Sequence, residues 1–215
     1  MPYLRTFGIL ALTASLSACQ VFTANTQSTE PSTRLQGALT YTNAQWLFQP
    51  CSSSDNYVLK PSQALSEELD MLRPEAPEGL FVDFSGHFDA SKQSFTPTQR
   101  YRLQIEGHGC DDADFTRLLI RASGNEPFWS VLQTPKGLIL NLPGEPAVAL
   151  PYIEEQLPGG QFNISSEANS QNLRLWISPQ QCIDSMSGTV YHLTAKLQLN
   201  EQTLNGCATF GALRN

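Results

Sequence analysis

The chain has 215 residues, 40% of them hydrophobic, and its 20 acidic and 13 basic residues give a formal net charge of −7 at pH 7. This length is enough to bury a real core, as one domain or as two small ones. The acidic balance argues against a nucleic-acid partner, because such affinity comes largely from Lys and Arg that neutralise phosphates.

Residues 1–18 are predicted to be a secretory signal peptide. Arg5 precedes an apolar run from Phe7 to Leu12, which is shorter than the roughly 20 apolar residues of a membrane-spanning helix. The next segment, Leu16-Ser17-Ala18-Cys19, resembles the lipobox of bacterial lipoproteins, whose cysteine sulfur receives a diacylglycerol. We therefore expect the signal to be removed and Cys19 to carry acyl chains that anchor the protein in a membrane. The alternative is a secreted protein with a chance cysteine.

Residues 19–34 are predicted to be a lipidated, flexible tether. The segment is rich in Ser, Thr, Asn, Gln and Pro and has little apolar surface to bury, so burial cannot offset the entropy of ordering it. Gln20 stands where an Asp would favour retention in the inner membrane under the enterobacterial sorting rule. The expected location is therefore the outer membrane, with the protein held by its lipid and facing the periplasm.

Four cysteines remain beside Cys19, and an even number in an oxidising compartment indicates disulfides. Three connectivities are possible. The one that keeps each bridge inside one half of the chain joins Cys51 to Cys110 and Cys182 to Cys207.

A metal site is the competing interpretation of the first pair. His87 and His108 lie in the same half of the chain as Cys51 and Cys110. No two of these residues have the close spacing of a zinc or copper motif such as CxxC or HxxxH. We therefore expect no metal and no cofactor.

Residues 35–112 are predicted to form a small β domain with one helix. Ser62 can cap a helix from Gln63 to Leu72, in which Leu65 and Leu69 recur at helical spacing and which Pro74 ends. Five strands with one intervening helix fit a barrel of the OB type. The predicted strands are Leu35–Tyr41, Trp46–Phe48, Tyr57–Leu59, Leu80–Phe88 and Tyr101–Ile105.

Residues 113–215 are predicted to form a second β domain, an antiparallel barrel or rolled sheet. The boundary falls near Asp111–Asp114, an acidic run that lacks the glycine and distal Glu of a calcium loop. The predicted strands are Phe115–Ala122, Phe128–Gln133, Gly137–Asn141, Ala147–Leu150, Leu173–Ile177, Tyr191–Leu199 and Thr203–Ala208. The fold class expected for the whole chain is thus mainly β, with two small antiparallel barrel-like domains.

Three short motifs in the second half carry a resemblance to a known group of proteins. They are Gly124-Asn125-Glu126-Pro127-Phe128-Trp129, the CxDxMSG segment Cys182–Gly188 and Gly206-Cys207-Ala208. In this order they resemble the C-terminal module of largely uncharacterised Gram-negative envelope lipoproteins. The first half, through Gly37, Trp46–Phe48, Cys51 and Phe81–Phe88, is more distantly similar to domains of these lipoproteins and of NlpE-like proteins, which are linked to copper and envelope stress. The CxxC of the NlpE-like proteins is absent, which weighs against a copper role.

The motifs allow a structural and a functional interpretation. Structurally, Gly124 and Asn125 turn the chain with positive φ, Phe128 and Trp129 enter the core or a barrel mouth, and the turn Met186–Gly188 is pinned by the second disulfide. Functionally, one pocket gathers five motif residues, in which Glu126 and Asp184 form a carboxylate pair for acid–base chemistry. The candidate pocket residues are Asn125, Glu126, Trp129, Asp184 and Ser185.

Taken together, the sequence predicts a non-catalytic envelope lipoprotein that binds or senses a small ligand, a cell-wall component or an envelope protein. The alternatives are a protein of copper or metal homeostasis or envelope stress, a cell-envelope hydrolase, and a scaffold of an envelope assembly. The motifs contain no histidine, His192 is expected mid-strand, and the chain has no GxSxG, HExxH or phosphate-binding glycine loop. We therefore expect no enzymatic activity.

Overall fold

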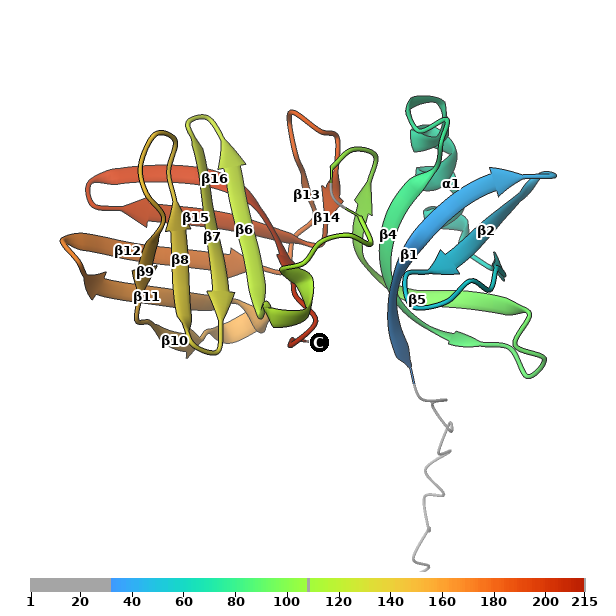
Figure 1. The fold of residues 1–215 in the computed structure, drawn as a ribbon, viewed down its shortest axis with the longest axis horizontal. Helices are drawn as coiled ribbons and strands as arrows, with labels where there is room; N and C mark the ends of the chain where they lie inside the picture. The colour runs from blue at the N-terminus through green and yellow to red at the C-terminus, as the bar shows by residue number, and fades with distance from the viewer. Residues whose placement is uncertain (1–31, 108, 215) are drawn as a thin grey trace, which may run out of the picture.

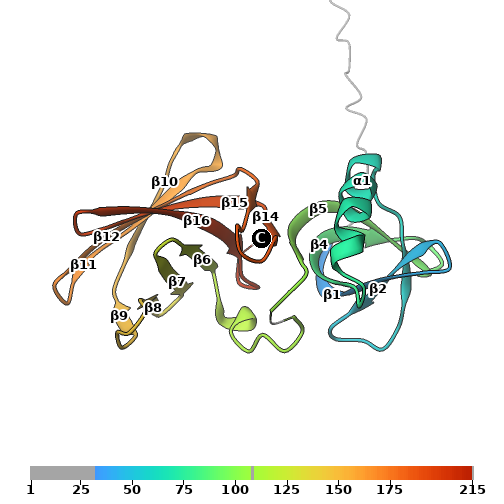
Figure 2. The same ribbon diagram turned by 90° about the horizontal axis from the view of Figure 1, so that it is seen from above.

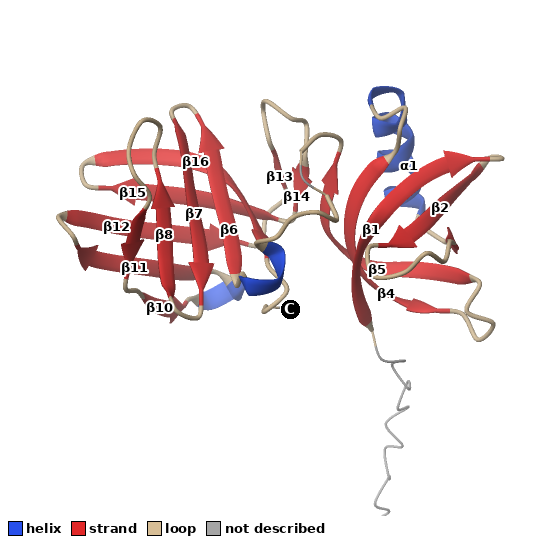
Figure 3. Ribbon diagram, in the orientation of Figure 1, coloured by secondary structure: helices blue, strands red, loops and turns tan. Residues whose placement is uncertain are grey.

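The computed structural model describes residues 32–107 and 109–214. The predicted signal peptide, Cys19 and His108 lie outside these residues. The chain is mainly β, as predicted, and forms two strongly curled sheets that lie side by side (Figures 1 and 3). Seen from above, the C-terminus lies between the two bodies (Figure 2).

The first half folds into a closed five-stranded barrel in the order β1-β2-β3-β5-β4, with β4 returning to β1. Only the β3–β5 pair is parallel. This order, with a helix between β3 and β4, is that of an OB-type barrel and confirms the prediction. The strands are β1 (Thr33–Thr42), β2 (Gln45–Pro50), β3 (Tyr57–Leu59), β4 (Leu80–Phe88) and β5 (Ser94–Gln104).

The helix α1 (Gln63–Leu72) begins and ends where its sequence predicts. The Ser62 hydroxyl accepts a hydrogen bond from the backbone N–H of Leu65 at 3.3 Å, which satisfies one of the free donors of the first turn. Leu65 and Leu69 are buried in the barrel core, beside the rings of Phe48, Phe84 and Phe95. A 3₁₀ turn from Arg73 to Glu75 follows the helix.

The second half forms a nine-stranded antiparallel sheet that curls around its own core. Its edge strands β9 and β10 are separated by only Pro151 and Tyr152, so the chain itself brings the two edges near each other. In spatial order the strands are β10 (Ile153–Gln156), β11 (Phe162–Ala168), β12 (Gln171–Ser178), β15 (Leu193–Leu199), β16 (Gln202–Phe210), β6 (Ile120–Asn125), β7 (Phe128–Thr134), β8 (Gly137–Asn141) and β9 (Val148–Leu150).

Several predicted boundaries in the second half were wrong. Residues Phe115–Arg117 form a 3₁₀ turn, and the strand starts only at Ile120. The strands β10 and β11 were not predicted, because β10 is polar and exposed and β11 has a serine, Ser166, at an inward-facing position. The predicted strand Tyr191–Leu199 is broken at His192.

A short hairpin connects the two sheets. It consists of β13 (Cys182–Ile183) and β14 (Val190–Tyr191), and β14 pairs with Leu103 and Arg102 of β5. Val190 is buried in the core of the first barrel. The predicted boundary after residue 112 therefore separates most strands of the two sheets, but the CxDxMSG segment belongs to the sheet of the first barrel.

Arg34 forms a second connection between the sheets. Sequence reasoning placed this residue in the tether, but β1 already begins at Thr33. Its guanidinium donates to both carboxylate oxygens of Asp83, at 2.9 and 2.7 Å, and lies 3.9 Å from the centre of the Tyr101 ring. It also donates to the carbonyl oxygens of Phe210, Gly211 and Arg214, at the end of the second sheet. One buried cation thus joins the first strand of the barrel to the last strand of the chain.

Candidate functional site

The three motifs meet in one small hollow of about 350 Å³. The tight turn between β6 and β7 presents Asn125 and Glu126, and the β13–β14 hairpin presents Asp184 and Ser185. The Asn125 side-chain amide donates to Asp184 Oδ2 at 2.9 Å and holds the two segments together. Four of the five predicted pocket residues therefore line one hollow, here called the motif pocket.

Asp184 is largely occupied by the hairpin in which it lies. Its Oδ1 accepts hydrogen bonds from the N–H groups of Met186 and Ser187, at 3.0 and 2.8 Å, and from the Ser187 hydroxyl at 2.9 Å. Burial by itself raises the pKa of the Asp184 carboxyl, but the donors from Ser187, Asn125 and Met186 outweigh it and lower the pKa. The residue is thus an ionised turn anchor, whereas Glu126 is exposed.

Trp129 does not line the motif pocket. It is fully buried in the core of the second sheet, and its Nε1 donates to the carbonyl oxygen of Asn205 at 3.3 Å. A Cβ atom on Gly124 would lie 2.4 Å from Trp129 Nε1, and one on Gly206 would lie 2.8 Å from Trp129 Cζ2. Neither Gly124 nor Asn125 has positive φ, so the predicted turn role was wrong. Gly124 is required because the indole packs directly against it.

Three apolar side chains of the motif segments are exposed. Phe128 is 49% exposed, Ile183 61% and Met186 79%. Phe128 was expected in the core or a barrel mouth, but it lies opposite Asn125 on the outer side of the β6–β7 pair.

Both predicted disulfides are present. Cys51 is bonded to Cys110 and Cys182 to Cys207. These thiols are therefore not free to ligate a metal, and the described ranges contain no group of three or more His, Cys, Asp or Glu that could hold an ion. His87 lies on β4, paired in register with Thr96.

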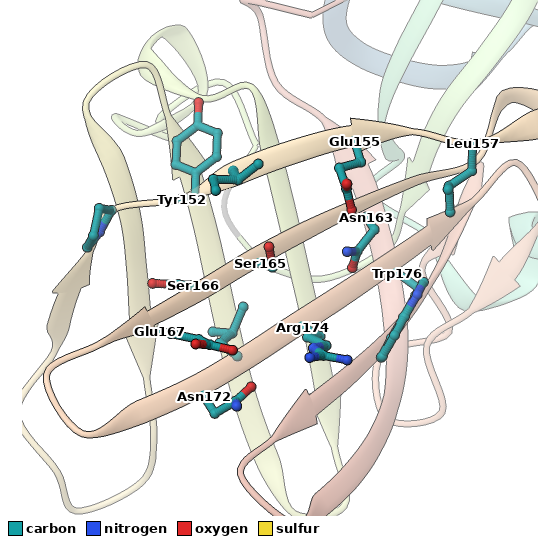
Figure 4. A pocket seen from close by; sticks show the side chains of 13 residues that line it. Tyr152, Glu155, Leu157, Asn163, Ser165, Ser166, Glu167, Asn172, Arg174 and Trp176 are labelled. Carbon is teal, nitrogen blue, oxygen red and sulfur yellow. The ribbon is translucent and has the colours of Figure 1, made fainter.

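A larger hollow, which sequence reasoning missed, lies on the outer face of β10, β11 and β12. It measures about 780 Å³, and Figure 4 shows the side chains that project into it. A second hollow of about 520 Å³ continues across β15 and β16, and Trp176 lines both. We call the two together the outer groove. Its main side chains are Tyr152, Glu155, Asn163, Arg174, Trp176 and Lys196.

The register of the strands sets the central row of the outer groove. Glu155 of β10 pairs with Asn163 of β11, and Asn163 with Trp176 of β12. Trp176 pairs with Lys196 of β15, and Lys196 with Asn205 of β16. Directly opposed residues of antiparallel strands have neighbouring side chains on the same face, so these five form a line across five strands.

Within the described ranges, the charged side chains of the outer groove and one amide oxygen have no partner. Asn163 Oδ1 is buried and has no hydrogen-bond partner in the described part of the chain. The side chains of Glu155, Arg174 and Lys196 are exposed and form no ion pair with another described residue. Because buried polar atoms are nearly always hydrogen-bonded, Asn163 Oδ1 is available to accept a hydrogen bond from a donor outside the chain.

The outer groove and the motif pocket share one lining residue. Asn205 lines both the second hollow and the motif pocket, and its carbonyl oxygen is the acceptor of the Trp129 indole. One sequence signal could have revealed the groove. In Leu173–Ile177 the apolar residues alternate inward, which places Arg174 and Trp176 on the outer face, where the indole can contribute to a binding surface.

No helix within residues 32–107 and 109–214 is long and apolar enough to cross a membrane. Comparison of the chain with protein-family models, curated proteins and solved structures gave no match.

Proposed function

We propose that the protein is a lipid-anchored lipoprotein of the outer membrane that faces the periplasm and acts there as a non-catalytic binding module. The anchor rests on the signal peptide and Cys19, and membership of the envelope lipoprotein group rests on the three motifs. The binding role rests on the outer groove.

The observation that carries the binding role is the half-buried Trp176 at the centre of two adjoining hollows. Binding sites combine concave surface and aromatic side chains with a few polar groups that are not used by the fold. The outer groove has these features, since Arg174, Lys196 and the Oδ1 atom of Asn163 flank the indole without a partner among residues 32–107 and 109–214.

The geometry of the motif pocket favours a structural role over catalysis. Acid–base chemistry at neutral pH needs a group whose pKa lies near the working pH. The hydrogen bonds to Asp184 lower its pKa and keep it in its turn, so it is poorly suited to serve as a general acid. The motifs therefore support the fold around Trp129 and leave ligand contact to the outer groove.

Anchoring is tested by substituting Cys19→Ser. We expect the wild-type protein to incorporate a labelled fatty acid and to sediment with membranes, and the variant to do neither. A Cys19→Ser protein that is processed and membrane-bound like the wild type would contradict the anchor.

Binding is tested with the mature lipoprotein immobilised from detergent and exposed to the soluble digest of isolated envelopes. We expect the wild type to retain envelope material that Trp176→Ala retains about tenfold less well, as for loss of a central aromatic contact. Lys60→Ala removes an exposed cation from the first barrel and should retain as much as the wild type. Equal retention by wild type and Trp176→Ala would refute the outer groove as the binding site.

A further inference from the structure

We infer that the outer groove binds an uncharged polysaccharide strand, laid across the β-strands from Tyr152 to the motif pocket. The inference rests on the proposed binding function and names its ligand class. The ligand would lie along the row of directly opposed residues that crosses five strands, namely Glu155, Asn163, Trp176, Lys196 and Asn205. With neighbouring strands about 4.8 Å apart, five strands give a row about 20 Å long. Such a row suits an extended polymer better than a compact ligand.

The register that creates this row is fixed by the fold. Asn169 and Ser170 form the two-residue turn between β11 and β12, and both have positive φ, as in the hairpin turns that match strand twist. A slip by one residue would send Asn163 and Trp176 to opposite faces. The side chains are therefore held in place before a ligand arrives.

Across β11, β12 and β15 the outer groove offers side chains and hardly any backbone. The N–H and C=O groups of β11, β12 and β15 are used in the pairing with their neighbours. An extended peptide binds most readily by pairing its own backbone with a free strand edge, not across the face of a sheet. A ligand on this face must instead carry hydrogen-bonding groups along its whole length, as a chain of hydroxyl-bearing sugar rings does.

The individual side chains match this chemistry. The Trp176 indole lies between the two hollows and offers a flat apolar face against which the C–H face of a sugar ring can pack. Asn163 Oδ1 lacks a donor, which a sugar hydroxyl or amide N–H would supply. Asn205 offers both a donor and an acceptor at the far end.

The charges favour an uncharged strand. Glu155 and Glu167 lie among the same lining residues as Arg174, and Lys196 follows in the second hollow, so neither sign dominates. A polyanion would meet the two carboxylates and a chain of net charge −7. A polycation would be repelled by Arg174 and Lys196, which lie beside the Trp176 indole.

The experiment uses the mature lipoprotein in a detergent without a sugar headgroup. Chito-oligosaccharides and cello-oligosaccharides of two to six rings are titrated by calorimetry and by tryptophan fluorescence. Trp46 and Trp129 are buried, at 6% and 0% exposure, so a ligand-dependent emission change reports mainly on Trp176. We expect affinity to rise with the number of rings until the groove is filled, and oligogalacturonates of equal length to bind at least about tenfold more weakly because of their charge.

Two variants and one control connect binding to the outer groove. Trp176→Ala and Asn163→Leu should each weaken oligosaccharide binding about tenfold or more, and Lys60→Ala should leave it unchanged. Asn163→Leu provides the test should Trp176→Ala fold poorly. Far-ultraviolet circular dichroism shows which variants are folded.

The outcomes separate the ligand class from the binding function. If no oligosaccharide binds while Trp176-dependent retention of envelope digest persists, the polysaccharide inference is overturned and the binding function stands. If the digest is not retained either, both are refuted. If oligosaccharide binding survived both substitutions, the polysaccharide would not bind in the outer groove.

Discussion

Substituting Arg34→Met is expected to destabilise the protein strongly and to uncouple its two sheets. The guanidinium is only 8% exposed, pairs with an Asp83 that is 1% exposed, and donates to three carbonyl oxygens at the end of the second sheet. Methionine keeps most of the length of the side chain and removes all of these donors.

The expected loss follows from what the substitution leaves behind. Asp83 keeps the Gln36 amide, 3.0 Å from its Oδ2, but loses the cation that is ion-paired with it. Breaking one side of a buried ion pair costs about 3–5 kcal/mol, because the remaining charge is desolvated without compensation. Since a typical domain is stable by about 5–15 kcal/mol, the variant should lose a large share of its stability.

Urea unfolding followed by circular dichroism and by tryptophan emission measures this effect. We expect the unfolding curves from the two probes to coincide in the wild type and to separate in Arg34→Met. Circular dichroism reports on both sheets, whereas two of the three indoles lie in the second sheet and only Trp46 lies in the first barrel. Removing both charges, with Asp83→Leu added to Arg34→Met, should recover part of the loss.

Arg117→Met is the matched control. Arg117 pairs with Asp114 at 2.6 Å, but its side chain is 54% exposed, so its loss should cost less than about 1 kcal/mol. If Arg34→Met behaved like Arg117→Met, the idea that a buried cation holds the two sheets together would be refuted.

Three further predictions concern the motif region and the junction. Gly206→Ala places a Cβ 2.0 Å from the carbonyl oxygen of Ser123 and should cost about 1–3 kcal/mol in thermal unfolding; an unchanged melting temperature would contradict the close packing. Opening the disulfide with Cys182→Ser and Cys207→Ser should cost about 3 kcal/mol, and a loss below about 1 kcal/mol would show that the bridge constrains little. Burial lowers the pKa of the His192 imidazole from 6.5 to about 4, so the unfolded chain binds this proton at higher pH than the folded one. Stability should therefore fall by up to about 3 kcal/mol as the pH decreases from 6.5 to 4, and His192→Phe should flatten that slope; an identical slope in both proteins would argue against this titration.

The parts of the fold that could be predicted from the sequence are those encoded locally. Ser62, the spacing of Leu65 and Leu69, and Pro74 determine where α1 begins and ends, and each acts within a few residues of its position. The disulfide pairing followed from the halves of the chain in which the cysteines lie. The strands β10 and β11 were not predicted, because their many polar side chains do not show locally which face is buried.

The candidate site was only partly predictable because it depends on register. The motifs indicated that Asn125 and Asp184 lie together, and their side chains are hydrogen-bonded. The outer groove combines residues from β10, β11, β12, β15 and β16. These residues do not form a recognisable motif in the sequence, because they come from different strands. A single sequence shows that Trp176 is on the outer face of a strand, but not that Asn163 and Lys196 flank it.

The motifs and the outer groove are nevertheless structurally connected through Trp129 and Asn205. Gly124 and Gly206 leave room for Trp129, and Trp129 Nε1 holds the carbonyl oxygen of Asn205. The side chain of Asn205 lies on the opposite, exposed side of β16 and ends the row that begins at Glu155. A buried indole therefore fixes the position of the last polar group in the outer groove. The residues of the three motifs thus set the geometry of β16 from behind, and we expect their substitution to weaken the proposed binding although only the neighbouring Asn205 faces the outer groove.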